Sequence, residues 1–182
     1  MSFVTDELRN GVLQATENEI LNGDGTGVRF AGLLNQTTQS VTVGALTELD
    51  TIYAAIDTVR ANFNEPDAVV LSQTDAQTIR LQKDSIEGYL MGDPSGAGAD
   101  TLFGKRLVVS PLMPAGTGLV GAFASGATIY DRHEPRIAWA SQGLSATGED
   151  LFIHNQVRAR AEERVGFVVN RPAAFCEIDF TP

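Results

Sequence analysis

Hydrophobic and polar residues alternate toward the end of the chain, between Leu151 and Arg164. The hydrophobic residues on odd-numbered positions are Leu151, Ile153, Val157, Ala159, Ala161 and Val165. The polar residues on even-numbered positions are His154, Gln156, Arg158, Arg160, Glu162 and Arg164. A period of two is typical of a β-strand whose side chains point alternately to its two faces. The pattern predicts a long strand from residue 151 with one wet face, pairing centrally in a sheet.

The first part of the chain has a helical spacing of apolar residues instead. These residues are Phe3, Val4, Leu8, Val12, Ala15 and Ile20. Asn22 and Gly23 follow them as a helix stop. We therefore expect an amphipathic helix of about five turns at the start of the chain. The polar and β-branched segment 36–43 is expected to be a loop or a short strand.

The middle of the chain predicts a helix, a buried strand and a second helix. Residues 47–50 carry a helix-starting cap, and Pro66 ends the pattern. The helix that begins at this cap is expected to pack on a sheet through one apolar stripe. The stripe consists of Leu49, Ile52, Tyr53, Ile56, Val59 and Phe63. The apolar run 68–71 is typical of a buried strand, and the capping pattern of 72–75 predicts a helix over 76–83.

Short strands are expected in the rest of the chain, at 106–109, 118–123 and 136–140, with a helical turn near 125–129. Segment 92–100 contains three glycines and a proline and has no periodicity, so we predict a protruding loop. Together these elements predict an α+β fold with a partly antiparallel sheet.

The composition is that of one globular domain. The chain has 182 residues, of which 43% are hydrophobic, and this is enough for a core without disulfides. Its single cysteine, Cys176, is expected to be a small buried side chain. No apolar run approaches the roughly 20 residues that a membrane-spanning helix needs, and the N-terminus lacks a signal-peptide pattern. We therefore expect no membrane association.

The net charge of the chain also narrows the classes of function that it can have. A net charge of −10 would repel phosphate backbones on average, so we expect no specific nucleic-acid binding. Arg158, Arg160 and Arg164 share one face of the predicted tail strand. We expect this face to meet solvent or to form ion pairs between subunits, rather than to contact DNA.

Candidate chemical sites are few. Segment 23–27 is rich in glycine, but it follows a helix and lacks the Gly-Lys-Ser/Thr ending of a phosphate-binding loop. Alternating polar residues in 22–26 open like a calcium loop, but the closing glutamate is missing. The two histidines, His133 and His154, have no zinc or triad spacing. We therefore expect no enzyme activity, no metal and no cofactor.

Several short motifs follow one another along the chain. Near the end stand Phe152, Asn155, the run Glu162, Glu163 and Arg164, and the pair Arg171 and Pro172. Near the start stands 20–27 followed by Gly32 and Leu33, and between lie segments 66–83, 104–110 and 127–132. In this order they resemble the C-terminal part of the tailed-bacteriophage major capsid proteins of the Hong Kong 97 type. The family's N-terminal arm, long hairpin arm and first part of the spine helix have no counterpart, so we expect a truncated form.

The resemblance implies a Hong Kong 97-like fold with axial and peripheral subdomains. Residues 1–45 would be the remaining spine helix and turn of the peripheral domain, and 46–133 the axial domain. Residues 134–165 would supply the peripheral strands, and 166–182 a final strand that returns to the axial domain. Segment 92–100 would point toward the centre of the capsomer.

The resemblance also implies a structural function, as a major capsid subunit of the icosahedral shell of a tailed phage or prophage. The alternative is the shell protein of a bacterial encapsulin-like nanocompartment that encloses a cargo enzyme. The implied partners are other copies of the chain and, in a full-length parent, a portal, a scaffold or a protease. The implied location is the virion, with the host cytoplasm before assembly. We expect the chain alone to be a monomer or small ring that does not close shells.

Two residues match crosslinking positions of the family. Some members join their subunits by an isopeptide bond between a lysine of the hairpin arm and an asparagine, helped by a glutamate, and Asn155 and Glu162 match the latter two. On an unbroken strand these residues would lie about 23 Å apart, too far to share one site within a chain. The chain has only two lysines, Lys83 and Lys105, and neither belongs to such an arm. We therefore expect no covalent crosslinking by this chain.

Overall fold

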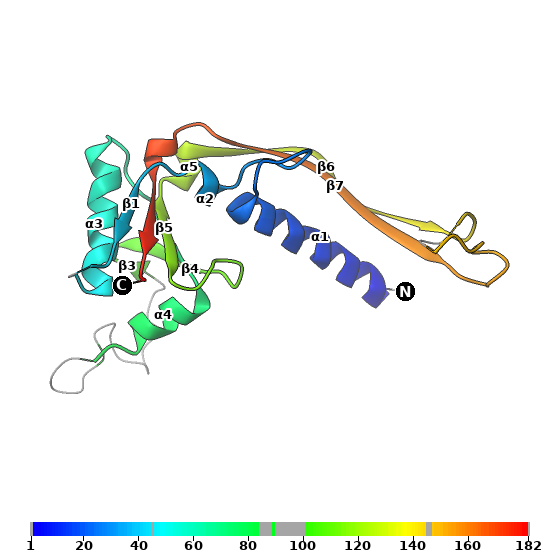
Figure 1. Ribbon diagram of the computed structural model, residues 1–182, viewed down its shortest axis with the longest axis horizontal. Coiled ribbons are helices and arrows are strands. Elements are labelled where there is room, and N and C mark those ends of the chain that lie inside the picture. Colours follow the sequence, from blue (N-terminus) through cyan, green and yellow to red (C-terminus); the bar gives the residue numbers. More distant parts are fainter. Residues whose placement is uncertain (1, 45, 84–88, 90–100, 145–146, 182) are drawn as a thin grey trace.

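The computed structural model describes residues 2–44, 46–83, 89, 101–144 and 147–181. Its helices are α1 Ser2–Asn22, α2 Leu33–Gln36, α3 Glu48–Ala61, α4 Gln73–Arg80 and α5 Phe123–Gly126, with a 3-10 turn Pro172–Ala174. Its strands are β1 Ser40–Thr42, β2 Ala68–Leu71, β3 Thr101–Leu102, β4 Lys105–Val109, β5 Thr117–Gly121, β6 Ala127–Ala140, β7 Arg158–Val169 and β8 Phe175–Asp179. A six-stranded sheet forms one end of the molecule, and a ribbon of β6 and β7 extends from it with α1 alongside (Figure 1).

The six-stranded sheet has the order β1-β8-β5-β2-β4-β3. The pairs β1–β8 and β2–β4 are parallel, and β2–β5, β3–β4 and β5–β8 are antiparallel. This mixture confirms the predicted α+β fold with a partly antiparallel sheet. Both faces of the sheet are covered, since α3 and α4 pack on one face and α2 with the base of the ribbon on the other.

Local capping signals fix where the two helices on the first face begin. The Thr47 hydroxyl accepts a hydrogen bond from the Asp50 amide at 3.2 Å, and Ser72 accepts one from Asp75 at 3.1 Å. Such caps satisfy amides that the first helical turn leaves unpaired. The predicted helices and the buried strand between them are therefore confirmed, with α4 ending at Arg80 rather than at 83.

Two members of the predicted α3 stripe do not belong to the core. Tyr53 is 45% exposed, and Phe63 lies beyond the end of α3 and is 99% exposed. The buried face of α3 consists instead of Thr51, Ile52, Ala55, Ile56 and Val59. The prediction was wrong at these two aromatic positions because the spacing of Tyr53 places it at the flank of the stripe, and because the helix ends before Phe63.

The second sheet face is organised around Phe175, a fully buried ring that contacts Phe123 at a centroid distance of 5.3 Å. Gly121 and Gly126 make room for it, since a Cβ atom at either position would lie within 2.7 Å of the ring. Cys176, the next residue of β8, is buried on the opposite face of the sheet, as a small buried side chain was predicted to be, and burial raises the pKa of its thiol to about 11. This thiol is therefore a packing group rather than a reactive one.

The tail strand differs from its prediction in two ways. Residues 151–155 form a turn, and β7 begins only at Arg158. The Asp150 carboxylate accepts the amide of Phe152 at 2.8 Å, and Asn155 has φ +50°, so local side-chain bonding replaces the extended chain. Moreover, β7 pairs with β6 in a separate sheet and not centrally in the six-stranded one. Within β7 the alternation is confirmed, because positions 158, 160, 162 and 164 are exposed and positions 159, 161, 163 and 165 are half-buried.

Helix α1 explains which face of the ribbon is half-buried. It runs from Ser2 to Asn22, as predicted, and lies along β6 and β7 (Figure 1). The side chains of Leu8, Val12, Thr16 and Ile20 are half-buried on one side of the helix. The helix ends just before Gly23, where no side chain fits because a Cβ atom would lie 2.4 Å from the Phe30 carbonyl oxygen. One side of the ribbon is therefore covered and the other is open.

The remaining predictions concern short segments and the division into domains. Segment 36–43 contains the short strand β1, and the helical turn is α5, which ends before β6 begins at Ala127. The loop prediction for 92–100 lies outside the described residues. The division into 1–45, 46–133, 134–165 and 166–182 stays a prediction; β1, from the first of these segments, pairs with β8, from the last. Among the described residues, no helix is long and apolar enough to cross a membrane.

Candidate functional site

Asn155 and Glu162 lie on different elements of the ribbon. Asn155 is the exposed last residue of the turn 151–155, and its backbone amide donates to the Phe152 carbonyl at 3.2 Å. Glu162 lies within β7, opposite Arg136 of β6, and its carboxylate pairs with Arg160 at 3.3 Å. Glu162 also lines a hollow of about 180 Å³ together with His133. The described contacts do not bring the two crosslink candidates together, and their role stays a prediction.

Both lysines lie away from the ribbon and have partners. Lys105 starts β4 and is bonded to the Glu65 carboxylate, and its side chain is only 15% exposed. Lys83 follows α4, and its ammonium lies 5.3 Å from the centre of the Tyr89 ring. An amine that attacks an amide carbon must be neutral and close to it. Neither lysine meets that condition with Asn155 of the same chain.

The open face of the ribbon is basic. In the β6–β7 register, Ala140 lies opposite Arg158, Ala138 opposite Arg160 and His133 opposite Arg164. Since directly opposed residues share a face, the small alanine side chains of β6 leave Arg158 and Arg160 prominent. We call Arg136, Arg158, Arg160 and Arg164, with Glu162 among them, the ribbon outer face; it carries four of the 13 basic residues of a chain whose net charge is −10.

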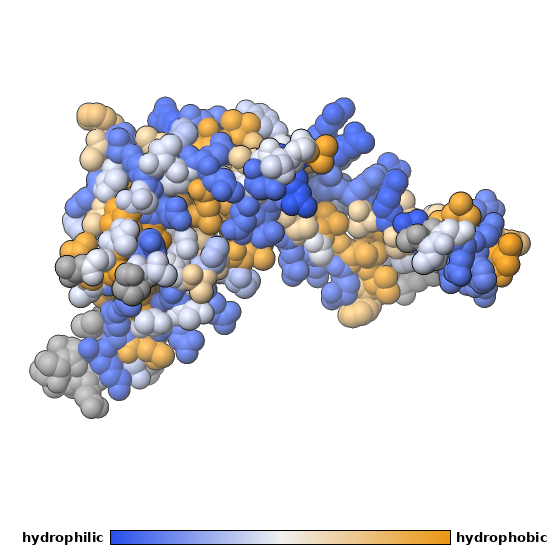
Figure 2. Space-filling model, viewed as in Figure 1, coloured by the Kyte–Doolittle hydropathy of each residue, from blue (hydrophilic) through white to orange (hydrophobic). Residues whose placement is uncertain are grey.

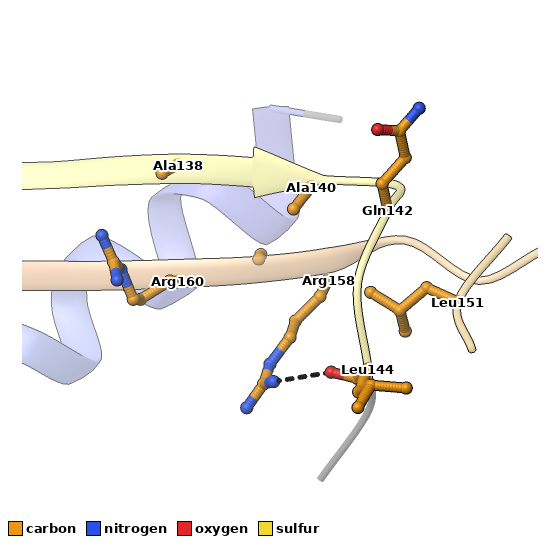
Figure 3. Close-up of a pocket in the computed structure, with 8 residues that line it drawn as sticks. Ala138, Ala140, Gln142, Leu144, Leu151, Arg158 and Arg160 are labelled. Atoms are coloured by element: carbon orange, nitrogen blue, oxygen red, sulfur yellow. Dashed lines mark hydrogen bonds between the residues drawn. The ribbon is translucent and has the colours of Figure 1, made fainter. Parts of the chain in front are cut away.

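The distal end of this face is hollowed. Side chains from both strands and from the connection between them line a hollow of about 520 Å³ (Figure 3). Ala138, Ala140 and Leu151 give it an apolar floor, and the Arg158 guanidinium donates to the Leu144 carbonyl at 3.3 Å. This combination suits an apolar side chain flanked by acidic groups. It carries no pair of groups poised for catalysis.

A polar contact joins α1 to the covered face of the ribbon. The Thr16 hydroxyl donates to the Glu163 carboxylate at 2.7 Å. A hydrogen bond to a carboxylate is stronger than a neutral one and fixes a geometry. This bond therefore sets the position of α1 along β7.

The opposite end of the molecule carries a second exposed surface. Tyr53 of α3 and Phe103 of the β3–β4 turn meet edge to face, with ring centres 5.3 Å apart. Beside them, Arg60 donates to the Glu65 carboxylate at 3.0 Å, and Lys105 joins the same carboxylate. The hydrogen bonds from Arg60 and then from Lys105 lower the pKa of Glu65 to about 2. We call Tyr53, Phe63 and Phe103, with Asp57, Arg60, Glu65 and Lys105, the α3 end surface.

The remaining sequence candidates are local structure. In the glycine-rich turn, the Asp24 carboxylate accepts from the Thr26 amide at 3.0 Å and from its hydroxyl, and these bonds lower the pKa of Asp24. His133 lies in the irregular part of β6, and His154 lies in the exposed turn before β7. Within the described part of the chain, no group of three or more His, Cys, Asp and Glu side chains is placed to hold a metal ion.

Comparison with known proteins gives the class of protein. The chain belongs to the phage capsid family, whose model matches residues 1–180. It is 29% identical over 183 residues to the major capsid protein of Enterobacteria phage HK97, covering 99% of this chain and 46% of that protein. The chain thus spans about half the length of that relative.

Solved structures show the same fold at lower identity. The capsid of an empty GTA particle matches with a TM-score of 0.74 and 22% identity, over 100% of this chain and 66% of that one. A structure from Microbacterium phage Oxtober96 matches with a TM-score of 0.77 and 15% identity, over 92% of this chain and 61% of that one. The predicted resemblance and the Hong Kong 97-like fold are confirmed.

Sequence reasoning missed the α3 end surface. It assigned Tyr53 and Phe63 to the core and gave Phe103 no role. A signal was present, because Phe63 stands between two asparagines just after a helix and Phe103 stands directly before a glycine in a hairpin turn. Both are positions where the chain usually needs a residue without a bulky side chain.

Proposed function

We propose that this chain is the shell-forming part of a major capsid subunit of a tailed phage or prophage. The observation that carries the proposal is the ribbon: two strands of 14 and 12 residues that project from the six-stranded sheet and keep one basic face open. Exposed strand edges are normally short or covered in a lone globular protein, whereas the long strands of this two-stranded ribbon each leave one edge unpaired in the described structure. In a shell, neighbouring copies supply the cover.

The partners in this proposal are other copies of the chain, in a virion after assembly and in the host cytoplasm before it. The role is structural and not enzymatic. Because the chain spans about half of its curated relative, contacts with a portal, a scaffold or a protease are proposed only for a longer parent. The named relatives are phage and GTA capsids, and they favour this function over an encapsulin-like compartment.

The test uses the complete reading frame that contains this chain, expressed with the assembly genes beside it. Negative-stain microscopy should show closed particles, and Arg160→Glu should abolish them by reversing a charge on the ribbon outer face. Arg29→Glu, an exposed arginine in the loop after α1, is the matched control and should assemble. A reading frame that yields no particles under these conditions would refute the capsid function.

A second measurement concerns the chain alone. Light scattering after size-exclusion chromatography is expected to show a monomer or small ring, because the net charge of −10 adds repulsion at low salt. Closed particles from the 182 residues alone would show that the ribbon and sheet contacts suffice without any further segment.

A further inference from the structure

The α3 end surface contains a phenylalanine at a backbone position that favours glycine. Phe63 has φ +60° and follows the C-cap residue of α3. Its amide donates to the Arg60 carbonyl at 2.9 Å, and the Asn64 amide donates to the Val59 carbonyl at 3.4 Å. These two bonds define a Schellman motif, whose left-handed residue is usually glycine or asparagine. A bulky side chain there is an outlier that strains the backbone.

A second phenylalanine repeats this pattern on the same surface. Phe103 and Gly104 connect β3 to β4, with Leu102 opposite Lys105, and their φ values are +50° and +74°. Two successive left-handed residues make a type I′ turn, for which asparagine followed by glycine is the preferred sequence. Phe103 therefore also occupies a position that a small polar residue would fill with less strain.

Burial within the chain does not compensate for this strain. Phe63 is 99% exposed, Phe103 is 47% exposed, and the Tyr53 ring that Phe103 touches is 45% exposed. Local rules of sequence that are broken without a gain inside the fold mark functional positions. The missing gain is expected to come from a partner that covers the rings.

The charges around the rings favour a partner of the same kind. Arg60 lies 3.7 Å from Asp57 and 3.0 Å from Glu65, and Lys105 completes the network. Two acidic and two basic groups cancel, so the surface is neutral although the chain carries a charge of −10. Two copies of such a chain repel each other over most of their surface, and this area lets them approach without that cost.

We infer that the α3 end surface is a contact between copies of this chain, with the three rings as its buried centre. The inference rests on the proposed function and names a specific contact for it. Each aromatic ring buries about 150–250 Å² when covered, and a standard interface buries roughly 800 Å² on each partner, so the rings form a core and the charged network a rim. Because the surface lies at the end of the molecule away from the ribbon tip, the contact is separate from the ribbon outer face (Figure 1).

The test replaces each strained ring by the residue that its backbone prefers. Phe63→Asn should raise the Tm of the isolated chain by about 2–4 °C by relieving strain, and Phe103→Asn should raise it by less, because it also removes the edge-to-face contact with Tyr53. The same variants should weaken self-association of the wild-type chain about tenfold or more in sedimentation equilibrium, since aromatic anchors dominate interfaces. Phe152→Asn is the control: its ring is 77% exposed, lies near the ribbon tip and is expected to leave that association unchanged.

Opposite shifts in Tm and association are the expected signature, because a strained ring without a partner would raise Tm on substitution and leave association unchanged, and a packing ring would lower Tm. A wild-type chain that stays monomeric up to its solubility limit would overturn the inference. The inference would also be overturned if Phe63→Asn associated as strongly as the wild type. It would be overturned as well if Phe152→Asn lost as much self-association as the two ring variants. Particles from the complete reading frame that are insensitive to both substitutions would sink this contact but leave the capsid function standing. If both variants lose self-association but the complete reading frame yields no particles, the contact stands and the capsid function is refuted.

Discussion

The six-stranded sheet and the β6–β7 ribbon use their side chains in opposite ways. The sheet buries both of its faces, and Val69, Leu71, Leu119 and Ile178 are completely inaccessible. The ribbon covers one face with α1 and leaves the other to solvent, although its strands are the longest in the described structure. In the space-filling view, hydrophilic residues lie along the upper edge of this arm of the molecule, and hydrophobic residues gather along its lower side, where α1 lies (Figure 2). The sheet therefore holds the fold together, while the ribbon offers a surface whose completion depends on a neighbour.

This division gives each region its own sensitivity to substitution. A residue in the sheet affects the whole cooperative unit, because interiors are close-packed and relax little. A residue on the open ribbon face affects few contacts of its own chain. Stability and assembly should accordingly be separable by substitution.

The largest expected effect is in the sheet. Phe175→Ala removes a fully buried ring that packs against Phe123 and should lower the free energy of unfolding by about 3–5 kcal/mol. Phe152→Ala, an exposed ring near the ribbon tip, should change it by less than about 0.5 kcal/mol. Urea denaturation followed by circular dichroism measures both. Similar losses in the two variants would mean that the ribbon tip shares the core of the sheet.

A smaller effect is expected where α1 meets the ribbon. Thr16→Val keeps the side-chain shape but removes the hydrogen bond to Glu163, at a cost of about 1 kcal/mol. Amide hydrogen exchange should accelerate in α1 and β7 and stay unchanged in β2 and β5. Thr78→Val is the control, because the Thr78 hydroxyl bonds only within its own helix, to the Thr74 carbonyl. Faster exchange in the sheet as well would break the proposed independence of the two regions.

The sequence predicted the sheet region better than the ribbon, for a physical reason. Caps at Thr47 and Ser72 and the apolar run of β2 are local signals, and they fixed α3, α4 and the strand between them. The alternation of the tail indicated a strand but not its partner, since the choice of β6 depends on contacts between distant segments. The break at 151–155 depends on the Asp150 carboxylate, which competes with the extended backbone and leaves no mark in the alternation.

Two neighbouring carboxylates on β8 link the stability of the sheet to pH. Burial, and then the charge of Asp179, raise the pKa of Glu177, whereas hydrogen bonds from Thr181 lower the pKa of Asp179. A raised pKa means that the folded state binds the proton more tightly, so ionised Glu177 reduces stability at neutral pH. Its stabilising contribution is complete below the ordinary carboxyl pKa and is lost as the pH rises through the raised value.

Glu177→Gln should therefore raise Tm at pH 7 by about 1–2 °C, and the gain should vanish in acid below the ordinary pKa of a glutamate. Asp179→Asn should have the opposite sign, lowering Tm at neutral pH and becoming neutral as the pH falls through the depressed pKa of Asp179. Scanning calorimetry across this pH range measures both variants. A loss of Tm in Glu177→Gln at pH 7 would show that the carboxylate has an ionic partner in the fold.

The smallest expected effect is none at all, and it concerns the ribbon tip. An isopeptide bond forms when a neutral lysine amine attacks the asparagine amide carbon and ammonia leaves, with a carboxylate taking the proton. Asn155 and Glu162 are present, but Lys105 is bonded to Glu65 on the sheet and Lys83 lies beside Tyr89. Denaturing gels of the concentrated chain should accordingly show monomer only, for wild type and Asn155→Ala alike. A heat-resistant ladder that disappears in Asn155→Ala, but persists in the nearby control Gln156→Ala, would refute this prediction. It would also show that the ribbon tip of one copy reaches a lysine on the sheet of another, which would join the two regions in one covalent contact.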